Sequence, residues 1–152
     1  MTRSMNIGII GAGIVGEATG KILATKHEVM YYDKYKEPWN TEACLTRIAR
    51  EAGIVFLCVP TPMKPSGAMD YSALYSSAEQ LLQATASVGR DSRTMIVVVR
   101  STAVSGTTDS VAQQFPFRFA FNPEFLREKH AEEDMVSTTR VVIGANDAEV
   151  SS

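Results

Sequence analysis

The sequence has few cysteines and no long apolar run. Only two cysteines, Cys44 and Cys58, occur among 152 residues, and they stand far apart in unrelated contexts. Two isolated thiols suggest neither a disulfide framework nor a metal site. No apolar stretch approaches the roughly 20 residues that cross a bilayer, so a membrane partner has no support. The N-terminus does not resemble a signal peptide, because its apolar stretch starts at once and is interrupted by glycines. A cytoplasmic protein is therefore the default expectation.

The chain also lacks an excess of charge of either sign. Lysine and arginine number 15, aspartate and glutamate number 17, and the net charge is -2. Binding of nucleic acid or anionic membranes through bulk charge requires a basic surface, so neither partner is expected. Hydrophobic residues make up 45% and charged residues 21%, which is ordinary for a soluble domain. The length suits one domain with one core.

The stretch around which the chain is organised lies near its start. An apolar run at residues 7–10 leads directly into residues 11–16, which read G-x-G-x-x-G. In a βαβ unit the first glycine permits a tight turn, the second lets a pyrophosphate approach the backbone, and the third lets the helix pack closely. The amides of that helix start then hold the phosphates. Because such turns also occur for packing reasons, the motif alone leaves both interpretations open.

An acidic residue at the end of the next apolar run favours the functional interpretation. The run at residues 28–32 ends in Asp33. In dinucleotide-binding units an acid about 20 residues beyond the glycines accepts hydrogen bonds from the adenosine ribose. The alternative is an aspartate that caps the next turn. A carboxylate there would repel a 2′-phosphate, which favours NAD over NADP. Lys34 either stays in solvent or contacts a ribose or phosphate, and it weakens this discrimination.

Apolar runs and amphipathic segments alternate along the chain. The predicted strands cover residues 5–10, 28–32, 54–59, 94–99, 117–121 and 140–144. The predicted helices cover residues 14–25, 41–51, 70–86 and 106–114, and residues 122–133 form a turn or helix. Alternation of this kind predicts an α/β fold: a Rossmann-like, doubly wound parallel sheet in three layers, α/β/α. Ligands of such sheets bind beyond the carboxyl ends of the strands.

Unusual residues gather at these predicted strand ends. Pro60 and Pro62 restrict Thr61, so this segment is either a rigid turn or a wall beside the cofactor with Thr61 as a hydrogen-bond donor. Ser101 and Thr102 follow the fourth strand. They either cap a helix or contact the nicotinamide ribose or the substrate.

Two glutamates follow the aromatic fifth strand. Glu124 and Glu128 are four residues apart and would share one face of a helix. One interpretation is a solvated acidic face. The other is chemical, because Glu124 directly follows Asn-Pro at a strand end, where it can act as a general base on water or on a substrate hydroxyl.

Together these motifs carry a family likeness. GAGIVG, the acid after the second strand, FLCVPTP, VVVRSTAVSGTT, FNPEFLRE and RVVIG occur in this order. Over most of its length the chain resembles the N-terminal domain of the UDP-glucose/GDP-mannose dehydrogenase family. Those enzymes oxidise the C6 alcohol of a nucleotide sugar to a carboxylate with two NAD, in polysaccharide biosynthesis. NPEFLRE, VPTP and the Ser-Thr stretch are far more specific than the glycines.

The resemblance implies roles for the residues at the strand ends. It implies that NAD is held by Gly11, Ala12, Gly13, Ile14, Val15, Gly16, Asp33 and Lys34, with Val59, Pro60, Thr61, Ser101, Thr102 and Glu128 at its nicotinamide half. Glu124 would be the acid/base residue that helps water attack a thioester. The nucleotide-sugar substrate would touch Glu124, Phe125, Leu126 and Arg127.

The chain also departs from the family pattern. The family's nucleophilic cysteine and catalytic lysine belong to a later central region, which residues 1–152 do not reach, and the UDP-binding domain is likewise absent. Between Asp33 and Ile54 there is too little sequence for one strand and helix, so a somewhat reduced sheet is expected. Lys129 and Thr138 stand where the family favours a small residue and a proline, whereas Asp134 fits.

Different functions are compatible with this pattern. The first is the NAD-binding domain of a UDP-glucose 6-dehydrogenase-like enzyme, in which a homodimer of the full-length protein is an option. Residues 1–152 alone would then bind NAD without completing the oxidation. The alternative is a stand-alone dinucleotide-binding or sensing module that lost the chemistry. Another dehydrogenase of the same fold, such as a 3-hydroxyacid enzyme, explains the glycines and Asp33 but not NPEFLRE.

Overall fold

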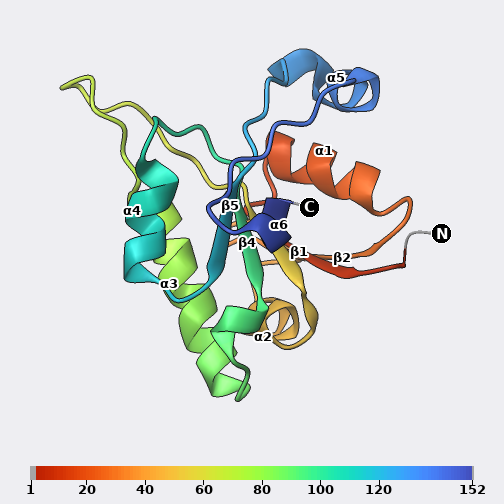
Figure 1. The fold of residues 1–152 in the computed structure, drawn as a ribbon. Coiled ribbons are helices and arrows are strands. Elements are labelled where there is room, and N and C mark those ends of the chain that lie inside the picture. Colours follow the sequence, from red (N-terminus) through yellow and green to blue (C-terminus); the bar gives the residue numbers. More distant parts are fainter. Residues whose placement is uncertain (1–2, 152) are drawn as a thin grey trace.

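Five parallel strands form the central sheet of the computed structural model, which describes residues 3–151 (Figure 1). They are β1 (Asn6–Ile10), β2 (Glu28–Tyr32), β3 (Ile54–Leu57), β4 (Ile96–Val99) and β5 (Arg118–Phe121). Their order is β2-β1-β3-β4-β5, and every pairing is parallel. This is the Rossmann order without the outer strand of its first half. The short segment after Asp33 predicted that reduction.

Helices cover both faces of the sheet. They are α1 (Ile14–Leu23), α2 (Glu42–Glu51), α3 (Ser72–Ser87), α4 (Thr107–Gln114), α5 (Ala131–Ser137) and α6 (Ala148–Ser151), with 3-10 turns η1 (Ser92–Thr94) and η2 (Glu128–His130). Figure 1 shows α3 and α4 on one side of the sheet and α1 and α5 on the other. In the part of the chain that the structure describes, no helix combines the length and hydrophobicity needed to span a bilayer.

The direction of winding changes at β1. From β1 the chain crosses to one edge through α1, and it then crosses back and outward through α2, α3 and α4. Right-handed crossovers in opposite directions place their helices on opposite faces. The carboxyl ends of β1 and β3 therefore flank the switch point, where doubly wound sheets bind ligands.

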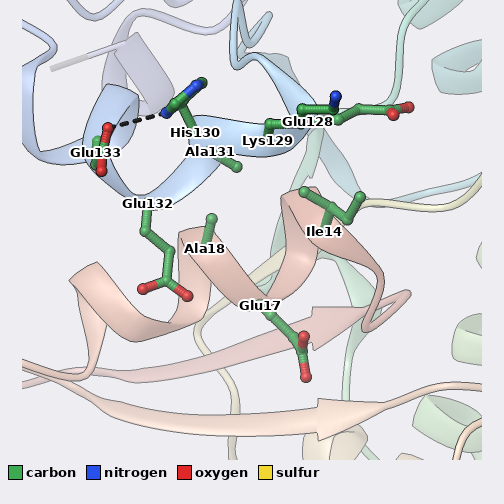
Figure 2. Close-up of a pocket in the computed structure, with 9 residues that line it drawn as sticks. All are labelled: Ile14, Glu17, Ala18, Glu128, Lys129, His130, Ala131, Glu132 and Glu133. Atoms are coloured by element: carbon green, nitrogen blue, oxygen red, sulfur yellow. Dashed lines mark hydrogen bonds and ion pairs between the residues drawn. The ribbon is translucent and has the colours of Figure 1, made fainter.

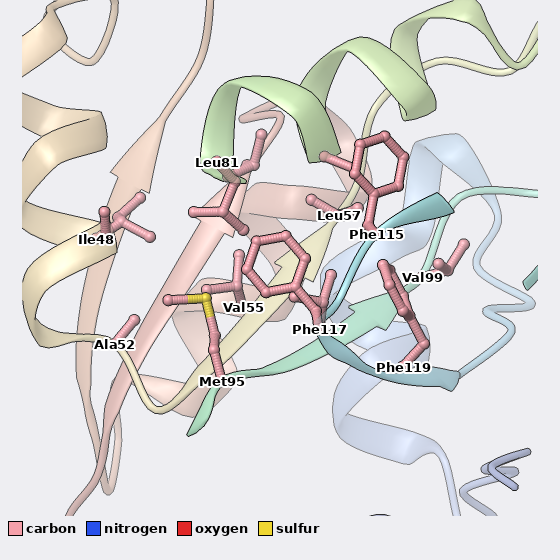
Figure 3. Packing of buried hydrophobic residues seen from close by; sticks show 14 of the residues in the cluster. Ile48, Ala52, Val55, Leu57, Leu81, Met95, Val99, Phe115, Phe117 and Phe119 are labelled. Carbon is pink, nitrogen blue, oxygen red and sulfur yellow. The ribbon is translucent and has the colours of Figure 1, made fainter. Parts of the chain in front are cut away.

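The main core lies between the sheet and α2, α3 and α4. Alternate strand residues such as Val55, Leu57 and Val97 point into it and are fully buried, together with Ile48 of α2 and Leu81 of α3 (Figure 3). Burial of each such aliphatic side chain contributes about 1.5–3 kcal/mol. The apolar runs that predicted buried strands owe their burial mainly to this face.

The opposite face is only partly covered. Helix α1 packs on β1 and β2, and α5 packs on α1. Beyond α1, an apolar groove of about 400 Å³ runs along β3, β4 and β5. Ile54 and Phe56 line it and are half-buried, so β3 is fully covered on one face only. The three-layer arrangement is thus complete over β1 and β2 and open over the rest.

The predicted sixth strand is wrong. Residues 140–144 meet the sheet through one antiparallel bridge between Gly144 and Phe121. Val141, Val142 and Ile143 are 72%, 53% and 48% exposed. An apolar run indicates a strand but does not determine its direction of approach. This segment reaches β5 in the opposite direction and pairs at a single residue.

The predicted turn or helix at residues 122–133 begins late. The chain stays non-helical up to Arg127, and η2 and α5 follow. Pro123 disfavours helical geometry at Asn122. The carboxylate of Glu124 accepts the amide of Leu126 at 2.6 Å, a local bond that competes with a helix. The prediction that Glu124 and Glu128 share a helical face is therefore wrong.

Other boundaries shift by one or two residues. Strand β3 ends at Leu57, and β4 begins at Ile96 after η1. The helix predicted to start at residue 70 is α3. The helix begins at Ser72, and Asp70 Oδ1 accepts the Ser72 amide at 2.9 Å. The loop after Asp33 folds back on the domain, and Trp39 stacks on Tyr31 with ring centroids 4.8 Å apart.

One substitution tests the packing of α1 on the end of β1. A Cβ atom at Gly16 would lie 1.9 Å from the carbonyl oxygen of Gly11, which is backbone and has no rotamer to move. We expect Gly16→Ala to destabilise the fold by about 1–3 kcal/mol, as overpacking does. Urea unfolding followed by circular dichroism measures this. In the control Gly53→Ala, the new Cβ would meet only Asn6 O at 4.0 Å. Equal midpoints for the two variants would contradict the close contact.

Candidate functional site

The glycine turn has the geometry that its sequence predicts. Gly11 ends β1 with φ of 95°, and a Cβ there would lie 2.6 Å from Cys58 O. Gly16 packs directly on the Gly11 carbonyl. Gly13 is exposed, and in the described part of the chain no atom other than those of Gly13 and its two chain neighbours lies within 4 Å of the position that its Cβ would take. The turn is closed on the side of the sheet and open above Gly13.

Free amides lie at the start of α1. Within residues 3–151, no hydrogen bond occupies the N–H groups of Gly13, Ile14, Val15 and Gly16. The N-cap residue is Gly13, which has no side chain to cap them. These donors stand at the positive end of the helix dipole, which is the arrangement that binds phosphates. A diphosphate fits this turn, since the space above Gly13 is clear.

Asp33 binds the turn and keeps one acceptor position. Its Oδ2 accepts the Ala12 amide at 2.8 Å, and its Oδ1 accepts the amides of Tyr35 and Lys36 at 2.9 and 3.0 Å. A carboxylate offers about four acceptor positions, so about one remains for a ribose hydroxyl. Capping a turn and binding a ribose were alternatives for Asp33 in the sequence. The structure shows the capping and leaves the ribose position available.

A cavity of about 110 Å³ lies beside Asp33 at the switch point. It brings together five predicted site residues: Gly11, Asp33, Lys34, Val59 and Pro60. Side chains of α3 that the sequence did not single out complete its lining: Ala73, Ser76, Ser77 and Gln80. The Lys34 ammonium lies 5.5 Å from the centroid of the Tyr35 ring. Its predicted cofactor contact stays a prediction.

Hydrogen bonds join the loops after β3 and β4 to each other. The Thr61 hydroxyl donates to Thr102 O at 2.6 Å, and the buried Ser101 hydroxyl donates to Val59 O at 2.7 Å. The proton of Thr61 is therefore already engaged and is not a free donor toward a cofactor. Capping by Ser101 and Thr102 is also wrong, because α4 begins only at Thr107, after Gly106 with φ of 86°.

A second cavity, of about 410 Å³, lies between α1 and the η2–α5 segment. Figure 2 shows Ile14 and Glu17 of α1 on one side and Glu128 and Glu133 on the other. Glu128 thus lies across from the first residue of α1, near the glycine turn. Its predicted contact with the nicotinamide half of the cofactor stays a prediction.

Glu124, Phe125 and Leu126 lie elsewhere, at the end of the apolar groove. Phe125 is 81% exposed. Arg127 does not present a free guanidinium. Its Nη2 lies 2.7 Å from Asp134 Oδ1, and this contact holds the pKa of Asp134 at about 2. The four predicted substrate residues are adjacent, but one of them is engaged in an ion pair.

Arg100 is a buried cation behind this loop that sequence reasoning did not select as a site residue. It is 6% exposed, and its Nη1 donates to Asn122 Oδ1. Asn122 Nδ2 in turn donates to Val142 O at 2.8 Å. Within residues 3–151, Arg100 Nε has no partner, and burial lowers the pKa of the guanidinium. The sequence feature that could have indicated Arg100 is a charged residue at the end of an apolar strand.

The two cysteines are free. Cys58 follows β3 and is half-buried, and burial of its thiol raises the pKa to about 12. Cys44 is also half-buried and lies on α2, where its sulfur accepts the Thr41 hydroxyl at 3.1 Å. Among the residues that the structure describes, no group of three or more acidic, histidine or cysteine side chains is arranged to hold a metal ion.

Comparison with known proteins points to one family of dehydrogenases. The family model of the UDP-glucose/GDP-mannose dehydrogenase family, NAD binding domain, matches residues 36–152. A UDP-glucose 6-dehydrogenase of Rickettsia bellii is 32% identical over 133 residues, which cover 83% of this chain and 27% of that protein. The glycine turn and Asp33 precede the family-model match, so their assignment depends on their geometry.

Two solved structures resemble the fold. A UDP-glucose dehydrogenase from Pyrobaculum islandicum superimposes with a TM-score of 0.78 at 28% identity, over 98% of this chain and 42% of that one. A GDP-mannose dehydrogenase from Pseudomonas aeruginosa gives a TM-score of 0.80 at 27% identity, over 97% and 42%. The chain thus spans between about a quarter and two fifths of the length of these three proteins.

The family model covers residues 36–152, which is most of the chain, and two solved dehydrogenase structures share the fold. The chain belongs to the UDP-glucose/GDP-mannose dehydrogenase family, in the part that forms the NAD-binding domain.

Proposed function

We propose that this chain is the NAD-binding part of a nucleotide-sugar 6-dehydrogenase. Such an enzyme oxidises the C6 alcohol of a nucleotide sugar to a carboxylate with two NAD. The observation that carries the proposal is the set of amides at residues 13–16, which have no hydrogen-bond partner among the described residues and stand near Asp33 with clear space above Gly13. The names of the similar proteins supply the substrate class.

The loops at the different strand ends bind different parts of the cofactor. The amides at residues 13–16 hold the diphosphate, and the remaining acceptor position of Asp33 takes a ribose hydroxyl. The negative charge of Asp33 opposes a 2′-phosphate. When bound, NAD supplies the acceptor for the hydride that leaves C6. The tied loops at Thr61 and Ser101 form a stiff wall for the nicotinamide half, with Glu128 across from α1.

Glu124 is the proposed general base. It is half-buried at the end of the apolar groove, in the same lining as Arg100. A carboxylate in that position can take a proton from water as the water attacks an acyl group. Phe125 and Leu126 extend beside it and would contact the substrate, and Arg127 would do so on leaving Asp134.

The thiol nucleophile of the acyl step is not assigned to this chain. A nucleophilic cysteine reacts as a thiolate, and the high pKa of Cys58 opposes that form. Cys44 lies on α2, which packs on α3 in the layer opposite α1. We infer that another region of a longer enzyme supplies the thiol, so residues 1–152 bind NAD without completing the oxidation. Two free cysteines also suit a cytoplasmic location. A homodimer of the full-length protein stays a prediction.

The cofactor preference tests the role of Asp33. By titration calorimetry we expect NAD to bind more tightly than NADP. Asp33→Asn should weaken NAD binding by about 10- to 100-fold, the effect of losing a hydrogen bond to a charged group, and should remove the preference. Glu37→Gln changes an exposed carboxylate of the same loop and should have little effect. Equal affinities of the unchanged protein for the two cofactors would reject the assignment.

The role of Glu124 is testable in an enzyme that includes the remaining length of the relatives. Glu124→Gln should slow the hydrolytic half-reaction by about 10²- to 10⁴-fold, the usual contribution of a general base, while NAD affinity changes little. Single-turnover kinetics separate the two steps. Glu133→Gln, an exposed glutamate of α5, is the control. A hydrolytic rate unaffected by Glu124→Gln would remove it as the base.

The cysteines make a further prediction. With a pKa of about 12, only about one Cys58 thiol in ten thousand is ionised at pH 8. We expect iodoacetamide to label Cys44 much faster than Cys58 in the native protein, as read by peptide mass spectrometry. Burial of the Cys58 thiol also limits access of the reagent, so labelling in urea, where both thiols are exposed, is the control for access. In urea the two rates should converge. Rapid native labelling of Cys58 would make it a candidate nucleophile after all.

A further inference from the structure

We propose that Lys36 is a positioning residue of the cofactor site, which holds the Ala12–Gly13 peptide so that the Gly13 N–H faces the diphosphate. The inference depends on the proposed function, because it names a further residue of the same site. Neither the glycine motif nor the acid after β2 points to it.

Lys36 reaches across the loop after β2 to the glycine turn. Its ammonium group donates to Ala12 O at 3.0 Å and to Glu17 Oε1 on α1 at 2.9 Å. From the same loop, Asp33 Oδ2 accepts the Ala12 N–H at 2.8 Å. Both polar groups of Ala12 are therefore bonded to charged side chains, an anion at its N–H and a cation at its C=O.

Because the peptide group is planar, these hydrogen bonds fix the orientation of the turn. In a trans peptide the C=O and the following N–H point in opposite directions. Because Ala12 O points to Lys36, the Gly13 N–H points away from Lys36. Among the described residues that amide has no partner, and the space above Gly13 is clear. By the same rule, the Ala12 N–H on Asp33 turns Gly11 O toward Gly16, where the close packing is observed.

The charge of Lys36 has two further effects on an anionic ligand. A cation at the carbonyl polarises the peptide and strengthens the N–H at its other end as a donor. The same ammonium pairs with Glu17, a carboxylate in the first turn of α1. Without that pairing, the charge of Glu17 would act on the diphosphate at close range. Lys36 thus offsets the one first-turn acid of α1.

The ion pair itself adds little to folding. The side chains of Lys36 and Glu17 are 44% and 40% exposed, and exposed pairs of this kind contribute little to stability. Removal of the ammonium should therefore change ligand binding more than folding, which makes the proposal separable from a merely structural role.

Lys26 provides a control. It carries the same charge and is exposed, but it follows the C-terminal end of α1, at the opposite end of the helix from the glycine turn. The sole tryptophan, Trp39, has its ring centroid 5.5 Å from the Lys36 ammonium. Its fluorescence reports whether a Lys36 variant keeps the local structure of the loop.

The experiment compares three ligands on the unchanged protein, Lys36→Met and Lys26→Met. NAD and ADP contain a diphosphate and are titrated by calorimetry, and adenosine lacks one and is titrated by NMR. We expect Lys36→Met to weaken NAD and ADP about tenfold and adenosine less than twofold. Lys26→Met should change each less than twofold. Adding Glu17→Gln to Lys36→Met should recover part of the loss, since it removes the unpaired carboxylate. Urea midpoints should stay close to that of the unchanged protein.

Each contrary outcome has a defined meaning. Equal effects of the two lysine variants on NAD would overturn the role of Lys36 and leave the proposed function intact, since the unchanged protein would still bind NAD. An equal loss for adenosine and ADP would also overturn it, because the variant would then have disturbed the whole site. Lys36→Arg, which keeps the charge, gives a second variant if Lys36→Met is unstable, and it should retain most of the affinity. Failure of the unchanged protein to bind NAD or ADP would reject the proposed function, and the inference with it.

Discussion

The contact between the backbone of Gly11 and the α-carbon of Gly16 is the constraint on which the rest of the site depends. No side chain fits between them, since a Cβ at Gly16 would lie 1.9 Å from Gly11 O. This contact sets the start of α1 directly over the end of β1. Gly13 then stands at the N-cap without a side chain, and the first amides of α1 face open space. A packing requirement and a phosphate-binding geometry are here the same structural feature.

Short hydrogen bonds between loops hold the rest of the site together at the carboxyl edge of the sheet. Asp33 bonds to the glycine turn, Thr61 bonds across to the β4 loop, and Ser101 bonds back to the β3 end. Each of these hydrogen bonds uses a side chain from a loop that follows a strand, so the register of the parallel strands decides which loops meet. The site is therefore stiff where the cofactor would bind.

At the end of the site that contains Glu124, a buried cation lies behind the loop. Arg100 is buried behind the loop that carries Glu124, and Asn122 links it to the segment at Val142. Among the described residues, Arg100 forms no ion pair with a carboxylate, which is costly for a buried guanidinium. Its contacts to the Asn122 amide and the Met135 sulfur therefore orient the charge rather than neutralise it. This arrangement holds the loop of Glu124 on one side of an apolar groove. The nucleotide-sugar dehydrogenases of this family that the chain matches are much longer than the chain itself.

The sequence alone determined the five parallel strands, the helices α1 to α4, the glycine turn and the acid beside it, because these depend on local periodicity and on backbone freedom at Gly11. It could not predict that residues 140–144 would pair at one residue only, since an apolar run carries no direction. It paired Glu124 with Glu128 by spacing, whereas Pro123 and the Glu124–Leu126 bond keep that segment out of a helix. The roles of Lys36 and Arg100 appeared only in the tertiary structure, because their partners are brought near by the crossovers and not by the sequence.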